Sequence, residues 1–212
     1  MHHDSPEFLR VSSPLVLASH NLNKIAAMKE ALVGCPAELL SARQLNLQSP
    51  DETGNTVLEN ALIKARSVAQ QSGHAAISDD SGFFISALDD LPGAAAVDWA
   101  GPDSDHTPAL RRIGDMLSER GLTTSAARFV TVIAAALPDG TAIAEEGATH
   151  GHLVWPPRGK TDGYLSVFAL SAGANSIAEL MVGQDAGTTH DLPAYAHRRP
   201  TIDRLMQRIR FS

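Results

Sequence analysis

The chain has 212 residues, of which 43% are hydrophobic and 19% charged, and this composition predicts a folded domain with a substantial core rather than a disordered chain. Its 17 basic and 24 acidic residues give a net charge of −7, which argues against a general nucleic-acid-binding protein because such proteins carry a basic face. No apolar run reaches the length of about 18 residues that a membrane-spanning helix needs. The single Cys35 excludes an internal disulfide and fits a reducing, cytoplasmic setting.

Strand and helix signals alternate along the chain. Residues 1–13 are polar and lack the apolar segment of a secretory signal, so we expect a flexible tail followed by one two-lobed domain over 14–212. Apolar runs predict strands, and cap residues that flank a helical period predict helices. In chain order these signals predict a strand at 14–19, a helix at 21–33, a strand at 37–42, a helix at 56–72, strands at 75–78 and 83–88, a helix at 109–120, strands at 128–137, 141–154 and 164–170, and helices at 176–181 and 198–210.

Two local patterns support these assignments. Thr56 and Glu59 have the spacing of a capping box, which predicts the start of a helix. Pro138-Asp139-Gly140 is typical of a hairpin turn between two strands. Because strands and helices alternate first and a long hairpin follows, we expect an α/β fold with a mixed sheet in two lobes and a central cleft.

The segment Ser19-His-Asn-Leu-Asn-Lys24 joins a predicted buried strand to a predicted helix. Such a turn places backbone N–H groups and a lysine at a helix N-terminus, where a bound anion offsets the unfavourable contact between the lysine and the helix dipole. The glycines of a P-loop are absent. The alternative is a solvated lysine beside an ordinary helix cap.

Lys64 lies just outside the apolar arc of the predicted helix over 56–72, with Asn60 beside it. It therefore emerges where the helix meets the body of the protein, and it is a candidate ligand-binding cation. The alternative is a lysine whose stem covers core atoms while its charge reaches solvent.

The sequence Asp79-Asp-Ser-Gly82 directly follows a short apolar strand. Adjacent carboxylates repel each other, so a cation is expected nearby, and strand ends are where α/β sheets carry ligands. Carboxylate oxygens suit Mg²⁺, which binds one or two of them and leaves room for phosphate. The alternative is a surface turn, because Asp, Ser and Gly are turn formers.

Taken together, these segments resemble the inosine/xanthosine triphosphate pyrophosphatase family over residues 16–208. The most specific match runs from Glu52 to Ala65, where the family reads Glu-Thr-Gly-x-Thr-x-x-Glu-Asn-Ala-x-x-Lys-Ala. Further motifs are matched at Ser19, Asn21 and Lys24, at 79–82 and 92–93, and as partial echoes at 146–159, 163–164, 178–180 and 197–198.

The resemblance implies an elongated two-lobed α/β fold, usually a homodimer, and a Mg²⁺-dependent hydrolysis of a nucleoside triphosphate such as inosine triphosphate to a monophosphate and pyrophosphate. By position, Asp80 would activate water, Lys24 and Lys64 would grip the triphosphate, and Glu52, Asp79 and Asp80 would hold the metal. The residues that would contact the nucleotide are Ser19, Asn21, Lys24, Lys64, Ser81, Gly163, Tyr164, His197 and Arg198. The expected partner is a small-molecule nucleotide, with neither nucleic acid nor membrane.

The phosphate and metal motifs of the family are present, whereas its base-recognition motifs are altered. The departures fall at Asp98, Asp162, Leu165, Leu192 and Ala196, where the family usually has arginine, phenylalanine, aspartate, lysine and serine, respectively. Changed donors and acceptors imply a changed specificity. Three interpretations stay open: a triphosphate pyrophosphatase with its own base preference, a related hydrolase of a modified base or a monophosphate, and a non-catalytic nucleotide-binding homologue.

Overall fold

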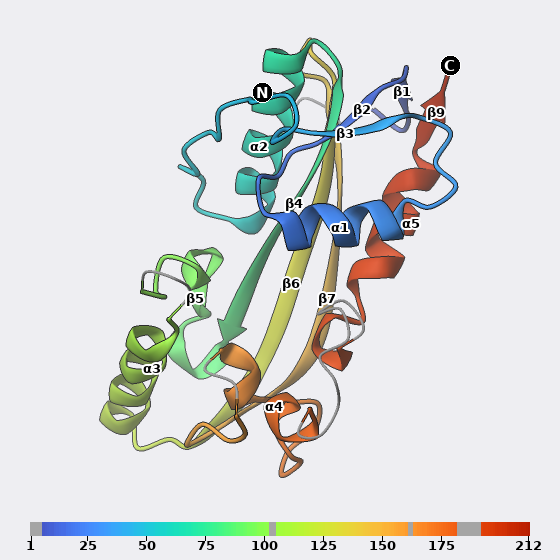
Figure 1. The fold of residues 1–212 in the computed structure, drawn as a ribbon. Coiled ribbons are helices and arrows are strands. Elements are labelled where there is room, and N and C mark those ends of the chain that lie inside the picture. Colours follow the sequence, from blue (N-terminus) through green and yellow to red (C-terminus); the bar gives the residue numbers. More distant parts are fainter. Residues whose placement is uncertain (1–5, 102–104, 161–162, 182–191) are drawn as a thin grey trace. The chain divides into compact units, whose positions relative to one another are not determined.

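The computed structural model describes residues 6–101, 105–160, 163–181 and 192–212. The chain forms two compact units, the first from Met1–Asp80, Thr131–Gly147 and Arg198–Ser212, and the second from Ser81–Val130 and Ala148–His197. Three long strands contribute residues to both units (Figure 1), namely β4 (Ala75–Ile85), β6 (Thr124–Ala136) and β7 (Ala142–Val154). Within the described ranges, no helix is both long and apolar enough to span a bilayer.

The first unit is built on a sheet with the strand order β3-β2-β4-β6-β7. Strand β2 runs parallel to both of its neighbours, as expected where helices connect successive strands. A separate parallel pair joins β1 to β9 (Figure 1). The other elements of this unit are β1 (Leu9–Val11), β2 (Leu15–Leu17), α1 (Leu22–Ala31), β3 (Leu39–Ser41), α2 (Val57–Ser72), α5 (Arg198–Gln207) and β9 (Ile209–Phe211).

Helix α2 begins and ends close to where the sequence predicts. The backbone N–H of Glu59 donates to the Thr56 hydroxyl, and the Glu59 carboxylate accepts from the Thr56 N–H, so the capping box forms. Gly73 ends the helix in the left-handed conformation at a φ of 70°. These caps fix the extent of α2 and therefore the face on which Lys64 lies.

Strand β4 extends beyond the end of its parallel neighbour β2. The register pairs Leu17, the last residue of β2, with Ile77, so residues 78–80 continue past that end. In α/β sheets, ligands bind beyond the carboxyl ends of the strands. The two aspartates of β4 therefore lie in the region of the first unit where ligand contacts are expected.

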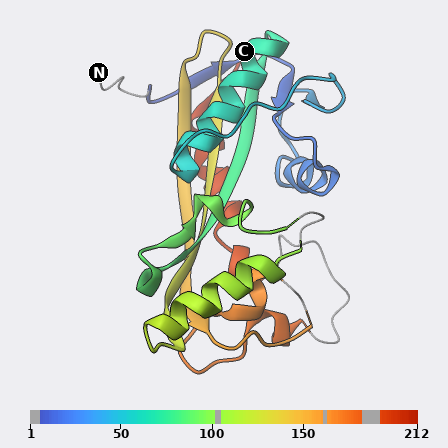
Figure 2. The same ribbon diagram turned by 90° about the vertical axis from the view of Figure 1, so that its left-hand side faces the viewer.

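Alternate side chains of β4 face opposite sides of the sheet. Ile77 packs in one apolar cluster with Ile25 of α1. The Ser78 hydroxyl instead donates to the carbonyl of Ala61 in α2, at 2.6 Å. Helices α1 and α2 thus cover opposite faces, as can be followed in Figure 2, and the two aspartates that come next are directed toward different helices.

Aliphatic side chains from strands and helices form the core of the first unit. Leu9 and Val11 of β1 belong to it, with 1% and 0% of their surface exposed. The expectation of a flexible tail over residues 1–13 is therefore wrong for residues 9–11. Their backbone pairs with β9, at the other end of the chain, and this partner cannot be read from local sequence.

The second unit has an aromatic core. The Phe83 ring lies 4.7 Å from the Phe129 ring and 5.1 Å from the Tyr164 ring, measured between centroids. Figure 2 shows α3 alongside the segment that carries α4, and Ile113 and Ile177 join the same cluster. Besides the shared strands, its elements are β5 (Leu91–Gly93), α3 (Thr107–Glu119), β8 (Phe168–Ala169), α4 (Ile177–Leu180) and short 3₁₀ helices at Ser86–Leu88, Ala94–Ala96, Tyr164–Val167 and Pro193–Tyr195.

The predicted mixed α/β class and most predicted elements are confirmed, but the prediction that 75–78 and 83–88 are separate strands is wrong. Residues 75–85 form the single strand β4, with Asp79 to Gly82 inside it rather than at a turn, and residues 86–88 form a 3₁₀ helix. The glycine serves packing instead, because a Cβ at Gly82 would lie 2.6 Å from the Gly93 carbonyl of β5.

Two further predictions differ from the structure at the C-terminal end. The expected strand at 164–170 is a 3₁₀ helix, Tyr164–Val167, followed by the short strand β8. The expected helix over 198–210 ends at Gln207 and is followed by β9. In both cases tertiary pairing decides the conformation of a short apolar segment whose local propensity is ambiguous.

Candidate active site

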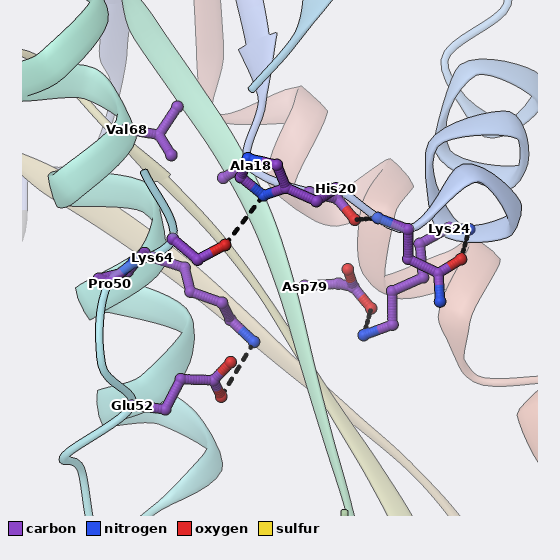
Figure 3. Close-up of a pocket in the computed structure, with 11 residues that line it drawn as sticks. Ala18, His20, Lys24, Pro50, Glu52, Lys64, Val68 and Asp79 are labelled. Atoms are coloured by element: carbon purple, nitrogen blue, oxygen red, sulfur yellow. Dashed lines mark hydrogen bonds and ion pairs between the residues drawn. The ribbon is translucent and has the colours of Figure 1, made fainter. Parts of the chain in front are cut away.

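A pocket of about 190 Å³ opens beyond the end of β2 (Figure 3). It is smaller than the roughly 300–1,000 Å³ of pockets that enclose a whole small-molecule ligand, so it suits a part of one. All of its lining residues belong to the first unit: Ala18, Ser19, His20, Asn21, Lys24, Ser49, Pro50, Glu52, Lys64, Val68 and Asp79. The structure thus brings together side chains from three separate sequence motifs.

Lys24 of α1 forms an ion pair with Asp79 of β4, in which Nζ lies 3.3 Å from Oδ2 (Figure 3). Burial alone would raise the pKa of Asp79, but the positive charges of Lys24, Arg198 and Lys64 outweigh burial and lower it to about 2. Asp79 is therefore ionised at neutral pH. The predicted cation beside the adjacent carboxylates is present.

Lys64 of α2 contacts two carboxylates. Its Nζ lies 2.6 Å from Asp80 Oδ1 and 3.3 Å from Glu52 Oε2. Burial disfavours the charged lysine, but the charge and hydrogen bond of Asp80, with help from Asp79 and Glu52, outweigh it and raise the Lys64 pKa. Its side chain is only 13% exposed, so Lys64 does not place its charge in open solvent as the alternative interpretation required.

Asp80, like Asp79, is largely removed from solvent, whereas Glu52 is half exposed. Burial raises the pKa of Asp80 to about 6 despite the opposing charge of Lys64, and the nearby charge of Glu52 adds to the rise. Within the part of the chain that the structure describes, its Oδ2 is buried without a hydrogen-bond partner. A buried, unpaired carboxylate oxygen is costly, and such a group in a native protein is typical of a site that receives a further ligand.

The N-terminus of α1 differs from the expected cluster of free N–H groups. The side-chain Oδ1 of Asn21 accepts hydrogen bonds from the backbone N–H groups of Asn23 and Lys24, at 2.9 and 3.2 Å. Because these two donors are already paired, an anion at this turn would depend on Lys24 and on side chains. Asn21 itself could offer only its amide nitrogen.

Glu52, Asp79 and Asp80 were predicted to hold a metal together. Among the described residues, no group of three or more His, Cys, Asp or Glu side chains is arranged to hold a metal ion. The three carboxylates instead divide between Lys24 and Lys64. This set still suits Mg²⁺, which typically takes one or two protein carboxylates and completes its shell with water and substrate phosphate. The unpaired Oδ2 of Asp80 is a hard oxygen donor of the required kind.

Four predicted nucleotide contacts, Ser81, Gly163, Tyr164 and His197, belong to the second unit. The Tyr164 hydroxyl donates to the Ala96 carbonyl at 2.6 Å, and burial raises its pKa. The His197 ring lies 2.7 Å from the Thr149 hydroxyl through Nδ1. Both of these hydrogen bonds lie within the second unit.

Arg198 was also predicted to contact nucleotide, and it belongs to the first unit. Its Nε donates to the Thr131 hydroxyl at 3.4 Å, and its charge helps to lower the pKa of Asp79. The positive charge of Arg198 therefore acts on the same carboxylate as the charge of Lys24.

The positions that depart from the family pattern have distinct surroundings. Leu165 is buried in the apolar cluster of the second unit, and Leu192 packs against that cluster. Asp98 and Ala196 are exposed. Asp162 lies outside the described residues.

His20 and Ser49 line the pocket, although sequence reasoning gave them no role. His20 stands between Ser19 and Asn21, inside a motif that was itself recognised, so its position in the turn was an available signal. Ser49 precedes the motif that begins at Glu52 and has no distinguishing pattern of its own.

Known proteins resemble this chain in sequence and in fold. The model of the Ham1 family matches residues 15–198. A dITP/XTP pyrophosphatase of Bradyrhizobium sp. strain BTAi1 is 44% identical over 163 residues, which cover 75% of this chain and 76% of the relative. A protein of the same name from Bradyrhizobium diazoefficiens is 38% identical over 202 residues, which cover 93% and 96%.

Solved structures extend the likeness to the fold. A HAM1 protein from Coxiella burnetii matches with a TM-score of 0.79 and 26% identity over 93% of this chain and 98% of that one. A nucleoside-triphosphatase / dITP/XTP pyrophosphatase from Mycobacterium abscessus matches with a TM-score of 0.71 and 28% identity over 93% and 99%. The match to the family model runs from the first residue of β2 to the first residue of α5, which is most of the chain. The chain therefore belongs to the Ham1 family.

Proposed function

We propose that the chain is a Mg²⁺-dependent pyrophosphatase that hydrolyses nucleoside triphosphates, including non-canonical purine forms, to a monophosphate and pyrophosphate. The observation that carries the proposal is the pocket of the first unit, where Lys24 and Lys64 meet three carboxylates. The names of the relatives from both Bradyrhizobium strains, dITP/XTP pyrophosphatase, support the same reaction.

Lys24 and Lys64 are the proposed ligands of the phosphate oxygens. Phosphoryl transfer spreads negative charge over these oxygens, and fixed cations stabilise it. Both lysines are held by carboxylates, which orients them before substrate arrives. Ser19 and Asn21, on the same pocket wall, are the proposed polar contacts to the polyphosphate.

Asp80 is the proposed general base. Its raised pKa, near 6, brings its basicity closer to neutral pH than that of an ordinary carboxylate, which favours proton abstraction from water. Oδ1 bonds to Lys64, so both proposed roles of Asp80 fall on Oδ2, which has two lone pairs: one contacts Mg²⁺ and the other accepts the proton. The hydroxide equivalent formed in this way attacks phosphorus, and pyrophosphate leaves.

Glu52 and Asp79, with Asp80, are the proposed contacts of Mg²⁺, which would neutralise phosphate charge when it is bound. Binding of a metal–nucleotide complex requires the lysines to shift part of their pairing from carboxylate to phosphate. Glu52 is the least constrained of the three, because its side chain is 46% exposed and bonds to Lys64 at 3.3 Å.

A second candidate, a hydrolase with another nucleotide specificity, is favoured by Leu165. The family pattern has an aspartate at this position, whereas Leu165 is an apolar core residue here and offers no hydrogen bond to a base. The family resemblance also implies a homodimer, which light scattering after gel filtration tests, and the single Cys35 fits a cytoplasmic setting.

A pyrophosphate-release assay tests the function. The substrates are ITP, dITP, XTP, ATP and GTP, each with Mg²⁺ and with excess EDTA. Release from ITP, dITP or XTP that requires Mg²⁺ is the expected result. Activity confined to a different nucleotide would favour the second candidate, and thermal stabilisation by nucleotides without turnover would favour a non-catalytic homologue.

A further inference from the structure

His20 makes two side-chain hydrogen bonds across the pocket. Its Nε2 lies 2.8 Å from the carbonyl oxygen of Leu47, and its Nδ1 lies 3.0 Å from the hydroxyl of Ser49. A carbonyl can only accept, so Nε2 carries the hydrogen, and in the neutral ring Nδ1 accepts from Ser49. Both ring nitrogens are therefore engaged by protein, and neither is left to contact a phosphate directly.

These bonds join two chain segments that form different parts of the pocket lining. One is the turn after β2, which carries Ser19 and Asn21 and leads into α1 with Lys24. The other is the segment over 44–54, which contains Glu52 and forms no helix or strand. The backbone carbonyl of His20 also accepts from the Arg43 guanidinium, at 3.3 Å, just before this segment.

The same segment is fastened to α2 at two other points. Gln71 exchanges two hydrogen bonds with the backbone of Gln48, at 2.9 and 3.0 Å. The N–H of Gly54 donates to the Asn60 side chain at 2.8 Å. The segment is therefore bonded to α2 through Gln48 and Gly54, and to the turn before α1 through His20.

We propose that His20 is a positioning residue. It fixes the separation between the turn before α1 and the segment over 44–54, and so keeps Glu52 beside Lys64. The inference rests on the proposed function, because it assigns His20 a role in the placement of that site. It acts through Glu52 rather than by touching substrate. Small displacements of a site group reduce turnover strongly, since the reacting geometry is lost.

Two variants separate the bonds. His20→Ala removes both, whereas His20→Gln retains an amide donor close to the position of Nε2 and can restore the bond to Leu47. His74→Ala is the matched control, because it removes an exposed imidazole that does not line the pocket. Amide hydrogen exchange over residues 44–52, kcat/KM and the Mg²⁺ concentration for half-maximal activity are measured for each.

For His20→Ala we expect amide exchange over 44–52 to accelerate about tenfold and kcat/KM to fall on the order of tenfold, with a higher Mg²⁺ requirement. His20→Gln should recover part of both effects, and His74→Ala should change neither. In a Glu52→Gln background, His20→Ala should lower kcat/KM less than about twofold further, because the group it positions is already altered.

Unchanged exchange over 44–52 in His20→Ala would overturn the inference, and so would faster exchange with unchanged kinetics. A full additional loss in the Glu52→Gln background would show that His20 acts by another route. If the wild-type protein hydrolyses no nucleoside triphosphate, the proposed function fails instead, and the exchange measurement still decides whether His20 holds the segment.

Discussion

The pocket of the first unit contains several charged side chains, whereas the family-motif positions 164 and 165 of the second unit contain none. In the first unit, Lys24 and Lys64 pair with carboxylates that are largely removed from solvent. In the second unit, Tyr164 bonds to a backbone carbonyl and Leu165 is buried among apolar side chains. The first unit holds oppositely charged side chains close together. The second unit has a buried apolar side chain, Leu165, where the family has an aspartate.

This difference suggests that the charged side chains of the first unit serve chemistry, whereas Leu165 of the second unit serves stability. Buried charges are expensive to hold, so their retention in the first unit indicates chemistry that needs them. A buried leucine contributes to stability and its side chain offers no hydrogen bond, so we do not expect the side chain at position 165 to recognise a nucleotide base. We therefore expect substitutions in the first unit to change turnover, and substitutions at position 165 to change stability.

The largest effect is expected for Asp80→Asn. Loss of a general base typically lowers turnover by about 10²–10⁴-fold, whereas the amide preserves the shape of the site and nucleotide binding. Steady-state pyrophosphate release and calorimetric titration measure the two quantities. Asp115→Asn, on the exposed face of α3, is the control and should leave both unchanged. Near-normal turnover in Asp80→Asn would remove it from the role of base.

Leu165→Asp tests the stability side of the comparison. It restores the family residue but buries a carboxyl group in the apolar cluster, so the free energy of unfolding should fall by about 3 kcal/mol. Denaturant unfolding measures the change. Ala196→Ser also restores a family residue, but at an exposed position, and should alter stability by less than about 0.5 kcal/mol. Equal effects of the two changes would contradict the comparison.

Lys64→Ala is expected to raise KM by roughly tenfold to a hundredfold, because a hydrogen bond to a charged group contributes about 1.5–3 kcal/mol. The same change leaves Asp80 buried without its cation, so the melting temperature should fall more at pH 8 than at pH 5, where Asp80 is largely protonated. Lys29→Ala serves as the control lysine. A fall in stability with unchanged KM would assign Lys64 a structural role.

The smallest effect concerns the acid stability of the metal-free protein. The pKa of Asp79 falls from 3.8 to about 2 on folding, so its contribution is complete above pH 4 and is lost as the pH falls toward 2. Wild type should exceed Asp79→Asn by about 2 kcal/mol at pH 5, and the difference should vanish near pH 2. Unfolding in EDTA at several pH values measures it. A difference that is constant with pH would contradict the Lys24–Asp79 pairing.

Asp80 should show the opposite sign. Its folded pKa, about 6, lies above the ordinary value of 3.8, so it favours the folded state at low pH and loses that contribution as the pH rises through 6. The two adjacent carboxylates thus act in different pH ranges: stability rises from about pH 2 to 4 through Asp79 and falls from about pH 4 to 6 through Asp80.

The sequence predicted the fold class, and it singled out several of the charged side chains that line the pocket of the first unit, because both depend on local patterns. The capping box at Thr56 and Glu59 fixes α2, and α2 fixes the position of Lys64. The alternation of strand and helix before Asp79 predicts parallel strands, whose carboxyl ends gather the aspartates and Lys24.

Pairings distant in sequence could not be predicted in this way. β1 is a strand because β9 is beside it, and Asp79 to Gly82 are extended because β4 is held along its length. Local propensity favours a turn at Asp-Asp-Ser-Gly, and sheet pairing overrides it. The contacts of His20 likewise reach residues 27 and 29 positions away, where no sequence spacing predicts them.

The placement of both aspartates within β4 constrains how this site can vary. Neighbouring residues of a strand point to opposite sides, so each aspartate meets its own lysine only because of its parity along the strand. Insertion or deletion of one residue between Ala75 and Asp79 would exchange the two partners. Redesign of this site can therefore alter side chains, but it has to keep the residue count of the strand that bears them.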